Sequence, residues 1–360
     1  MEKYPVKEDG IVYRNPNTLF RYNAWPTICR DDEGVLYTVF SGLRGQHVCP
    51  FGKTCLCKSY DNGKTWSAPL IVNDTWLDDR DAGILCLGGK KMMVSWFTHP
   101  AEHYVNAARG AIWVPSVSLM DELYPSIPEE HGKGGSFLRV SEDGGLTWGD
   151  TYTLPISAPH GPIQRRDGSL LYLGKELLAI WDDSIEGPDV ILAMESRDDG
   201  KTWTELGKVP LPDVEGISWE RHLHEPHVLE LANGRLLGVI RGEWPRPTVY
   251  LTHSDDGGYT WSVPEALSIR GYPPYIMQHS SGAILITAGR RIPPYGQRVL
   301  VSYDGGDTWP DEYVLRDDAP NDDLGYPATV ELPDKKLLTV YYQWYPGDTM
   351  PSILYTKWSL

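Results

Sequence analysis

The sequence predicts an all-β fold built from six similar units, and two observations carry this prediction. An octapeptide of the form Ser-x-Asp-x-Gly-x-Thr-Trp occurs five times, beginning at residues 59, 141, 196, 254 and 302. Helical periodicity is weak along the chain, whereas 36 glycines and 29 prolines interrupt it at intervals that suit hairpins. Self-similarity of this kind indicates that one small unit is repeated.

Each octapeptide is expected to form a tight turn. In the first copy, the side-chain oxygens of Ser59 and Asp61 can accept hydrogen bonds from backbone amides, and Gly63 supplies a positive φ. Thr65 and Trp66 then begin the next strand, with the indole under the hairpin.

A second repeat supplies the expected inner strands. Short apolar segments follow a turn at residues 33–40, 89–97, 167–174, 233–241, 281–289 and 334–342. Six units with room for four strands each indicate a six-bladed β-propeller, because a closed ring protects the sheet edges. The last unit lacks the octapeptide, so residues 351–360 and 10–16 are expected to share one blade and close the ring.

Length and composition indicate one globular domain over residues 1–360, with an excursion of the chain at about 99–135 that is expected to form a loop over one face. The formal charge of -16 disfavours nucleic acid and anionic lipid as partners. No apolar run is long enough for a membrane span, and the amino terminus carries charges where a signal peptide needs apolar residues. A cytoplasmic location is therefore expected, with secretion left open.

No metal or cofactor is expected. The five cysteines crowd into the first quarter of the chain, which favours buried free thiols over a disulfide framework. His222, His224 and His227 could suggest a metal, but strand alternation turns the first two to one face and the third to the other.

The five octapeptides resemble the Asp-box repeats of the sialidase superfamily, and the six strand units match the six-bladed sialidase fold. The resemblance implies five Asp-box hairpins on the rim, away from the active face, so that the repeated turn is architecture rather than catalysis. It also implies an exo-glycosidase that hydrolyses a terminal acidic sugar, sialic acid or a related carboxylate-bearing sugar, from a glycan. In the family, three arginines bind the carboxylate, a tyrosine activated by a glutamate attacks the anomeric carbon, and an aspartate serves as acid and base.

The nucleophile pair is carried over from two segments. HEPHVLELANGRLLGVIR, residues 224–241, is similar to a family segment and implies that Glu225 polarises the nucleophile while Arg241 binds the carboxylate. DDLGYPATVEL, residues 322–332, opens the last blade where the family has its tyrosine, which makes Tyr326 the candidate nucleophile.

The remaining arginines come from three further segments. Arg21 in LFRYNAW would be the first carboxylate ligand, and Arg44 in SGLRG would line the pocket. The third ligand is expected in GRRIPPYGQRVLVSYDGG, where Arg291 is favoured and Arg298 comes close behind. Lysine would not serve, because only a guanidinium binds a carboxylate in a bidentate manner.

The proton donor departs from the family pattern. No carboxylate follows Arg44, and the only titratable side chain there is His47, which could take over acid and base chemistry. In WLDDRDAGI, residues 76–84, Asp79 or Asp81 could instead point inward as a carboxylic acid. The same aspartates could simply cap a turn by pairing with Arg80.

Two other functions remain open at this point. The chain could be a propeller lyase or hydrolase of another glycoside, with His47 transferring protons and Tyr326 only packing. It could also be a carbohydrate-binding propeller without catalysis. His160 is a further polar residue at a blade mouth, and four tryptophans could stack on sugars or belong to the core: Trp96, Trp219, Trp244 and Trp344.

Overall fold

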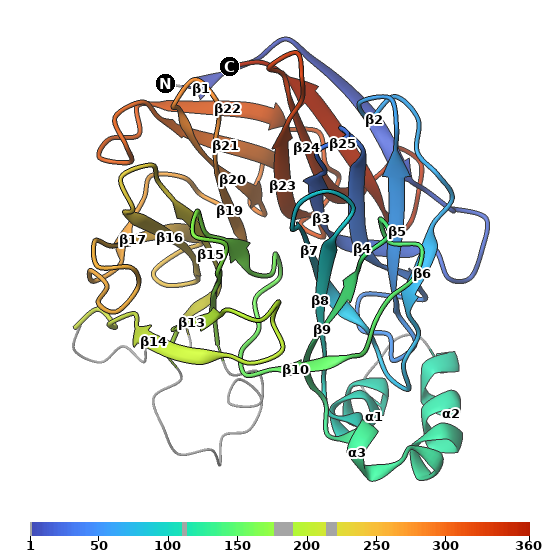
Figure 1. Cartoon of the computed structure of the whole chain (residues 1–360). Helices are drawn as coiled ribbons and strands as arrows, with labels where there is room; N and C mark the ends of the chain where they lie inside the picture. The colour runs from blue at the N-terminus through green and yellow to red at the C-terminus, as the bar shows by residue number, and fades with distance from the viewer. Residues whose placement is uncertain (1, 110–113, 176–189, 214–221) are drawn as a thin grey trace.

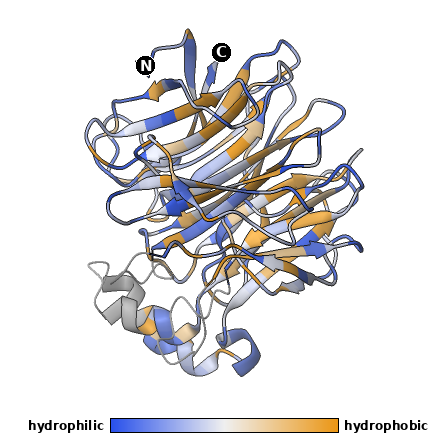
Figure 2. Ribbon diagram, turned by 90° about the vertical axis from the view of Figure 1, so that its left-hand side faces the viewer, coloured by the Kyte–Doolittle hydropathy of each residue, from blue (hydrophilic) through white to orange (hydrophobic). Residues whose placement is uncertain are grey.

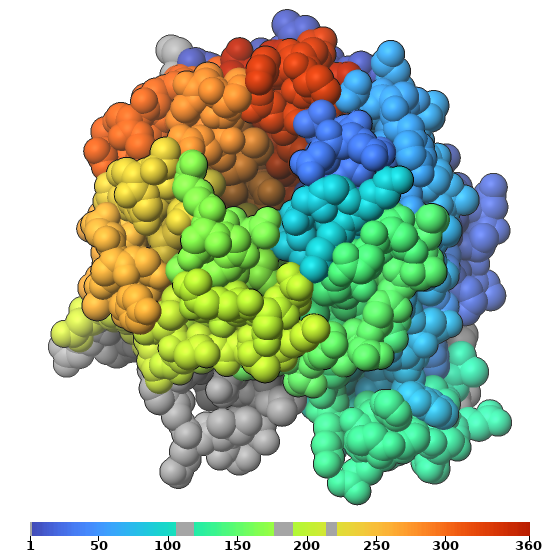
Figure 3. All heavy atoms as spheres, viewed as in Figure 1, coloured from blue at the N-terminus to red at the C-terminus, as the bar shows by residue number. Residues whose placement is uncertain are grey.

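A computed structural model, which describes residues 2–109, 114–175, 190–213 and 222–360, is a ring of six β-sheets (Figure 1). Each sheet contains an antiparallel blade of four strands. These are consecutive in the chain except in the last blade, whose fourth strand comes from the amino-terminal part, and the fifth sheet has an additional parallel strand from the same part. The colours of the space-filling view follow one another around the centre in chain order (Figure 3). The prediction of an all-β, six-bladed propeller is confirmed.

In the first three blades, the strands follow one another in chain order. The first contains β3 (Tyr22–Arg30), β4 (Leu36–Arg44), β5 (Lys53–Ser59) and β6 (Leu70–Asn73). The second contains β7 (Arg80–Cys86), β8 (Met92–Thr98), β9 (Gly135–Ser141) and β10 (Tyr152–Leu154). The third contains β11 (Ile163–Gln164), β12 (Leu170–Gly174), β13 (Leu192–Ser196) and β14 (Thr204–Lys208).

The last three blades complete the ring. The fourth contains β15 (Leu223–Glu230), β16 (Leu236–Gly242), β17 (Thr248–Ser254) and β18 (Glu265–Ala266). The fifth contains β19 (Pro274–Gln278), β20 (Ile284–Arg290), β21 (Gly296–Ser302) and β22 (Asp311–Arg316), with β1 (Glu2–Lys3) added in parallel to β22. The sixth contains β23 (Gly325–Glu331), β24 (Leu337–Trp344), β25 (Pro351–Trp358) and β2 (Lys7–Tyr13).

Strand β2 closes the ring as the sequence predicts. It pairs antiparallel with β25, and Ile11 lies opposite Leu354. Strand β2 near the amino terminus and β25 near the carboxyl terminus therefore belong to one sheet, and the two termini lie close together (Figure 1).

The core lies between neighbouring blades. Strand β4 is buried on both faces. Leu36 and Phe40 share a core with the sixth blade, and Tyr37 and Val39, on the other face, share one with the second blade. This two-sided burial explains why the second strand of each unit reads as a continuous apolar run. Apolar residues accordingly gather along the strands and polar residues in the connections (Figure 2).

The octapeptides join the third strand of a blade to the fourth. Asp61 accepts hydrogen bonds from the amide of Thr65 at 2.9 Å and from its hydroxyl at 2.6 Å, and the amide of Gly63 donates to Ser59 Oγ at 2.9 Å. The hydrogen bonds from Thr65 lower the pKa of Asp61 to about 2. The turns lie at the carboxyl ends of third strands, which is the end of the ring opposite to the amino ends of the innermost strands.

The excursion expected as a loop at 99–135 is mostly helical. It contains α1 (Ala101–Arg109), α2 (Val114–Leu123), η1 (Tyr124–Ser126) and α3 (Glu129–Gly132), which protrude from the ring (Figure 1). Alanine, glutamate and arginine favour α1, and Tyr104 and Met120 bury their side chains against Leu77. This packing supplies the tertiary contacts that a short helix needs. Within the described ranges, no helix is both long and apolar enough to cross a membrane.

Candidate active site

Four innermost strands share an unusual backbone feature. In each, the pairing register with the second strand shifts, and the residue inside the bulge has a positive φ although it is not glycine. These residues are Trp25 (φ 55°), Asp81 (47°), Glu225 (45°) and Tyr326 (51°). Left-handed backbone at such side chains costs free energy and commonly marks a functional site. The bulges turn one side chain from each of four blades toward the others.

Tyr326 and Glu225 form the centre of this cluster. The Tyr326 hydroxyl donates a hydrogen bond to Glu225 Oε1 at 2.5 Å, and Arg241 donates to Glu225 Oε2 at 2.7 Å and to Glu243 at 2.6 Å. Burial favours a raised pKa for Glu225, but Arg241 and the Tyr326 hydroxyl outweigh it and hold that pKa below its ordinary value. Burial, and then the charge of Glu225, raise the pKa of Tyr326 well above its ordinary value. The pair is thus an ionised carboxylate beside a protonated phenol.

Arg291 also lies near the phenol of Tyr326. Its guanidinium carbon is 5.8 Å from the Tyr326 ring, and it donates hydrogen bonds to the Leu324 carbonyl at 2.9 Å and the Tyr342 hydroxyl at 3.0 Å. Arg241 and Arg291 both lie over the ring of Tyr272, at 4.1 and 5.3 Å. The structure therefore brings Tyr326, Glu225, Arg241 and Arg291 together, as the sequence predicts.

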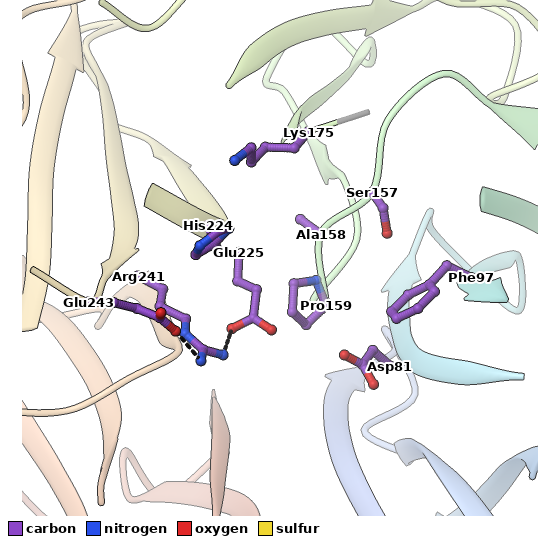
Figure 4. Close-up of a pocket in the computed structure, with 10 residues that line it drawn as sticks. All are labelled: Asp81, Phe97, Ser157, Ala158, Pro159, Lys175, His224, Glu225, Arg241 and Glu243. Atoms are coloured by element: carbon purple, nitrogen blue, oxygen red, sulfur yellow. Dashed lines mark hydrogen bonds and ion pairs between the residues drawn. The ribbon is translucent and has the colours of Figure 1, made fainter. Parts of the chain in front are cut away.

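A cavity of about 310 Å³ opens beside this cluster. Its walls include Asp81, Phe97, Pro159, Lys175, Glu225 and Arg241, and Figure 4 shows Asp81 and Glu225 on opposite sides. Burial raises the pKa of Asp81 to about 7 against the opposing effect of Arg80, and the Glu225 charge adds to the rise. Oδ1 of Asp81 is buried without a hydrogen-bond partner. Asp81 is therefore an inward-pointing carboxyl group that can hold a proton near neutral pH.

The other two aspartates of the segment 76–84 have structural partners. Asp79 accepts hydrogen bonds from the amide and the hydroxyl of Thr75, at 3.0 and 2.8 Å, so it caps a turn and does not line the cavity. Burial raises its pKa to about 7 as well. Asp78 binds the guanidinium of Arg44 through both oxygens, one of them at 2.6 Å. Arg44 is thus fully buried and neutralised beside the site.

Trp25 lies against two cations next to the cluster. Its rings lie 4.7 Å from the guanidinium carbon of Arg44 and 4.3 Å from that of Arg80. They also lie 6.3 Å from the Tyr326 ring. Only 2% of Trp25 is exposed, so the indole is buried and offers no face to a sugar.

Two predicted arginines lie elsewhere. Arg21 lines a separate hollow with Arg14 and Asp348, and Trp25 occupies the bulge of the first blade instead. Arg298 is on β21, a third strand, where it donates hydrogen bonds to the carbonyl oxygens of Arg316 and Gln297. A third strand is two strands away from the centre of the ring, which explains why Arg298 does not join the cluster.

His47 lies over Trp25 with its side chain half exposed. Its Nδ1 is 2.7 Å from the Tyr22 hydroxyl and 3.3 Å from Asp323, and its ring meets Trp25 edge-on at 5.1 Å. Partial desolvation by the groups packed around the ring, and then the charge of Arg80, outweigh Asp323 and lower the pKa of His47 although half of its side chain is exposed. This residue is fixed near the site but is not among those that line the cavity.

Other polar candidates take structural places. His160 Nδ1 lies 3.0 Å from the Thr27 hydroxyl, and burial lowers its pKa to about 3. His227 stacks on Tyr275 at 4.4 Å, whereas His224 lines the cavity. In the part of the chain that the structure describes, no group of three His, Cys, Asp or Glu side chains is placed to hold a metal ion.

The three predicted tryptophans that lie among the described residues pack against or bond to other residues of the protein. Trp96 is buried against Phe137, Trp244 packs in the core of the fourth blade, and the Trp344 indole donates to Asp323 at 3.3 Å. Trp219 lies outside the described residues.

Sequence reasoning missed Trp25, and it treated Arg80 only as a partner for capping aspartates. A signal for the bulges was present, because three of the four left-handed residues precede a proline, in Trp25-Pro26, Glu225-Pro226 and Tyr326-Pro327. A proline at that place ends the regular ladder of the inner strand. No comparable pattern in the sequence indicated Arg80 or Lys175. The ammonium group of Lys175 donates a hydrogen bond to the Leu223 carbonyl at 3.0 Å.

No family model and no curated protein matches the sequence. Solved structures do match the fold. A protein of unknown function from Dyadobacter fermentans has a TM-score of 0.76 at 22% identity, over 99% of this chain and 98% of that one. The NanB sialidase of Streptococcus pneumoniae has a TM-score of 0.70 at 15% identity, and the match covers 97% of this chain and 70% of that one. The intramolecular trans-sialidase of Ruminococcus gnavus has a TM-score of 0.66 at 16% identity, and the match covers 98% of this chain and 97% of that one. At these identities the likeness establishes a sialidase-like propeller fold and does not identify the substrate.

Proposed function

We propose that the protein is an exo-glycosidase that removes a terminal acidic sugar from a glycan, with a tyrosine as nucleophile. The observation that carries the proposal is the hydrogen bond of 2.5 Å between the Tyr326 hydroxyl and Glu225, between two cationic side chains and beside an open cavity. A phenol becomes a nucleophile when a neighbouring base can take its proton.

In the first step, the Tyr326 oxygen forms a bond to the anomeric carbon while its proton passes to Glu225. The bond between the anomeric carbon and the leaving oxygen breaks, and that oxygen takes a proton from Asp81. Arg241 and Arg291 stabilise the negative charge that develops on the phenol oxygen. In the second step, water attacks the glycosyl-tyrosine, Asp81 accepts a proton from the water, and Glu225 returns its proton to Tyr326.

Asp81 fits the role of proton donor better than His47. It lies across the cavity from Glu225 and carries a carboxyl whose pKa is raised to about 7 by burial. An acid of this pKa is mostly protonated just below neutrality and still acidic enough to donate. The pKa of His47 is lowered, and its Nδ1 lies 2.7 Å from the Tyr22 hydroxyl.

An acidic sugar is the substrate class that the arginines around the cluster favour. The overall charge of -16 repels anions, so an anionic substrate needs local cations such as these. The names of two of the neighbours in fold, both sialidases, point the same way.

The test is turnover of aryl sialosides and aryl uronides, followed by intact-mass measurement with a fluorinated analogue of the substrate that turns over. The proposal expects release of the aryl alcohol and a stable glycosyl adduct on Tyr326. Full activity in Tyr326→Phe with loss in His47→Ala would replace it with proton transfer by the histidine. Binding of an acidic glycan with no product after long incubation would replace it with a non-catalytic propeller.

A further inference from the structure

A second cavity, called the lower cavity below, lies toward the carboxyl ends of the innermost strands. It has a volume of about 340 Å³ and is lined from β7, β15, β19 and the segment that contains β11. Pro159 and Glu225 line the cavity of the candidate active site (Figure 4), whereas their neighbours His160 and His227 line the lower one. The two cavities therefore follow one another along the ring axis, and the lower one is large enough for a small-molecule ligand.

The floor of the lower cavity, nearest to the candidate active site, is uncharged. The amide of Ile276 donates a hydrogen bond to His227 Nδ1 at 3.3 Å, and burial holds the pKa of His227 well below its ordinary value. A neutral imidazole that accepts at Nδ1 carries its proton on Nε2, so Nε2 is a donor. His160 is neutral as well, because burial lowers its pKa to about 3. A charged group of a ligand would find no opposite charge on either imidazole.

The walls of the lower cavity carry apolar side chains. Ile163 of β11, Leu229 of β15 and Met277 of β19 line it, and each of them is partly exposed. Each also packs against an apolar core between two blades, which limits its movement. Three blades thus present apolar surface to a ligand, and covering that surface would favour binding.

Two glutamines at the rim of the lower cavity are held in the same way. Gln164 Nε2 donates to the carbonyl of Gly168 at 3.5 Å, and Gln278 Nε2 donates to that of Gly282 at 3.2 Å. In both, the amide nitrogen is anchored on the following turn, and no described residue donates to the amide oxygen. Each glutamine therefore offers an acceptor that a ligand can use.

The rim also carries one positive and one negative side chain. Glu230 accepts a hydrogen bond from the backbone amide of Arg166 at 2.8 Å, which joins the third and fourth blades at the cavity. Within the described ranges, the guanidinium of Arg166 has no ion pair or hydrogen bond. Because the two charges balance, the rim favours neither an anion nor a cation, and it offers both donors and acceptors.

We propose that the lower cavity is a second binding site and takes a small neutral sugar. Hydroxyl groups both donate and accept, so they match a rim of amide oxygens, one carboxylate and one guanidinium. The C–H face of a sugar ring suits the apolar walls of Ile163, Leu229 and Met277. The inference does not depend on the proposed function, because none of the residues that line the lower cavity also lines the upper one.

The test is saturation-transfer NMR with glucose, galactose and mannose, with N-acetylneuraminic acid as the competitor. At least one neutral sugar should bind, and the acid should not displace it. Met277→Trp, which fills the cavity, should abolish the signal, and Met277→Leu should keep it. Gln278→Ala, which removes one amide oxygen at the rim, should weaken binding about fivefold.

Gln46→Ala is the matched control. Gln46 also donates from its amide to a backbone carbonyl, that of Val48 at 2.8 Å, but it does not line the lower cavity, so this variant should bind the sugar normally. Four results would overturn the inference: no binding of any of the three sugars, displacement by the acid, undiminished binding in a folded Met277→Trp protein, and equal binding by Gln278→Ala and Gln46→Ala. Turnover of acidic glycosides should be unchanged in Gln278→Ala, which separates this inference from the proposed function.

Discussion

Tyr326 on the sixth blade donates a hydrogen bond of 2.5 Å to Glu225 on the fourth, and both residues have left-handed backbone inside a strand bulge. Two separate bulges must form for these side chains to meet. Strain stored at both ends of one hydrogen bond is expected where chemistry needs a fixed geometry.

Replacing Tyr326 by phenylalanine should remove the nucleophile and little else. We expect kcat/KM to fall by at least about 100-fold. Tyr341→Phe is the control, because this tyrosine of the same blade is equally buried but bonds to Arg316 and Thr356 instead. It should keep its activity and lose about 1 kcal/mol of unfolding free energy. Equal activity of the two variants in initial-rate assays would exclude Tyr326 from the reaction.

Asp81 should set the alkaline limb of the pH profile. Since its pKa is about 7 and the donor must be protonated, kcat/KM should be level below pH 7 and fall about tenfold per unit above it. Asp81→Asn should abolish this limb. For substrates whose leaving group needs no proton it should spare kcat/KM but lower kcat, because the second step uses Asp81 as base. Asp79→Asn should keep the limb, because Asp79 has a similar pKa but binds Thr75 instead of lining the cavity. A limb that survives in Asp81→Asn would point to another donor.

The same carboxyl should destabilise the fold at alkaline pH. Its folded pKa of about 7 lies above the ordinary value of about 3.9, so the folded state binds the extra proton and stability is lost as the pH rises from about 4 to 7. Asp81→Asn should therefore raise the unfolding free energy at pH 8 by up to about 4 kcal/mol and change it little at pH 4.

Urea titration at both pH values measures this difference, and Asp61→Asn supplies a control of opposite sign. The pKa of Asp61 is lowered to about 2 by its hydrogen bonds from Thr65, so its contribution is present above about pH 4 and lost as the pH falls through 2. Asp61→Asn should accordingly destabilise at pH 8. A loss of stability at pH 8 in Asp81→Asn would show that Asp81 is stabilised by its surroundings.

The third octapeptide should not tolerate a side chain at Gly200. This residue has a φ of +83°, and a Cβ built there would lie 2.7 Å from a methyl carbon of Leu138 on the preceding blade. Gly200→Ala should cost about 1 to 3 kcal/mol in denaturant unfolding. Gly257→Ala, with the same φ of +83° and no atom within 4 Å, isolates the backbone cost and should lose less. Equal losses would mean that contact between blades contributes nothing at this turn.

The fold could be predicted because its signals repeat. Five octapeptides and six apolar segments reinforce one another, and the missing sixth octapeptide correctly indicated a blade shared by both ends of the chain. The helices of residues 101–132 were not predicted, because their stability comes from contacts such as that of Tyr104 with Leu77, which no local pattern encodes.

The site was only partly predictable. Glu225 and Arg241 lie on paired strands, so their meeting follows from one local segment, and Tyr326 follows from its place at the start of a blade. Arg21 was expected four residues from where the bulge of the first blade lies, at Trp25. A bulge shifts the strand by a residue and changes which side chain points inward, and its position depends on pairing that a sequence does not display.

The pairing of Ile11 with Leu354 has a consequence for how the molecule is made. During synthesis, β2 emerges before any of the blades and must wait for β25, which is made after every other strand of the ring. Until then the sixth blade has an open edge, and Tyr326 has no completed sheet to hold it against Glu225. The hydrogen bond between Tyr326 and Glu225 should therefore become fixed only after β25 has been made, and chains that stop before the sixth blade should lack it.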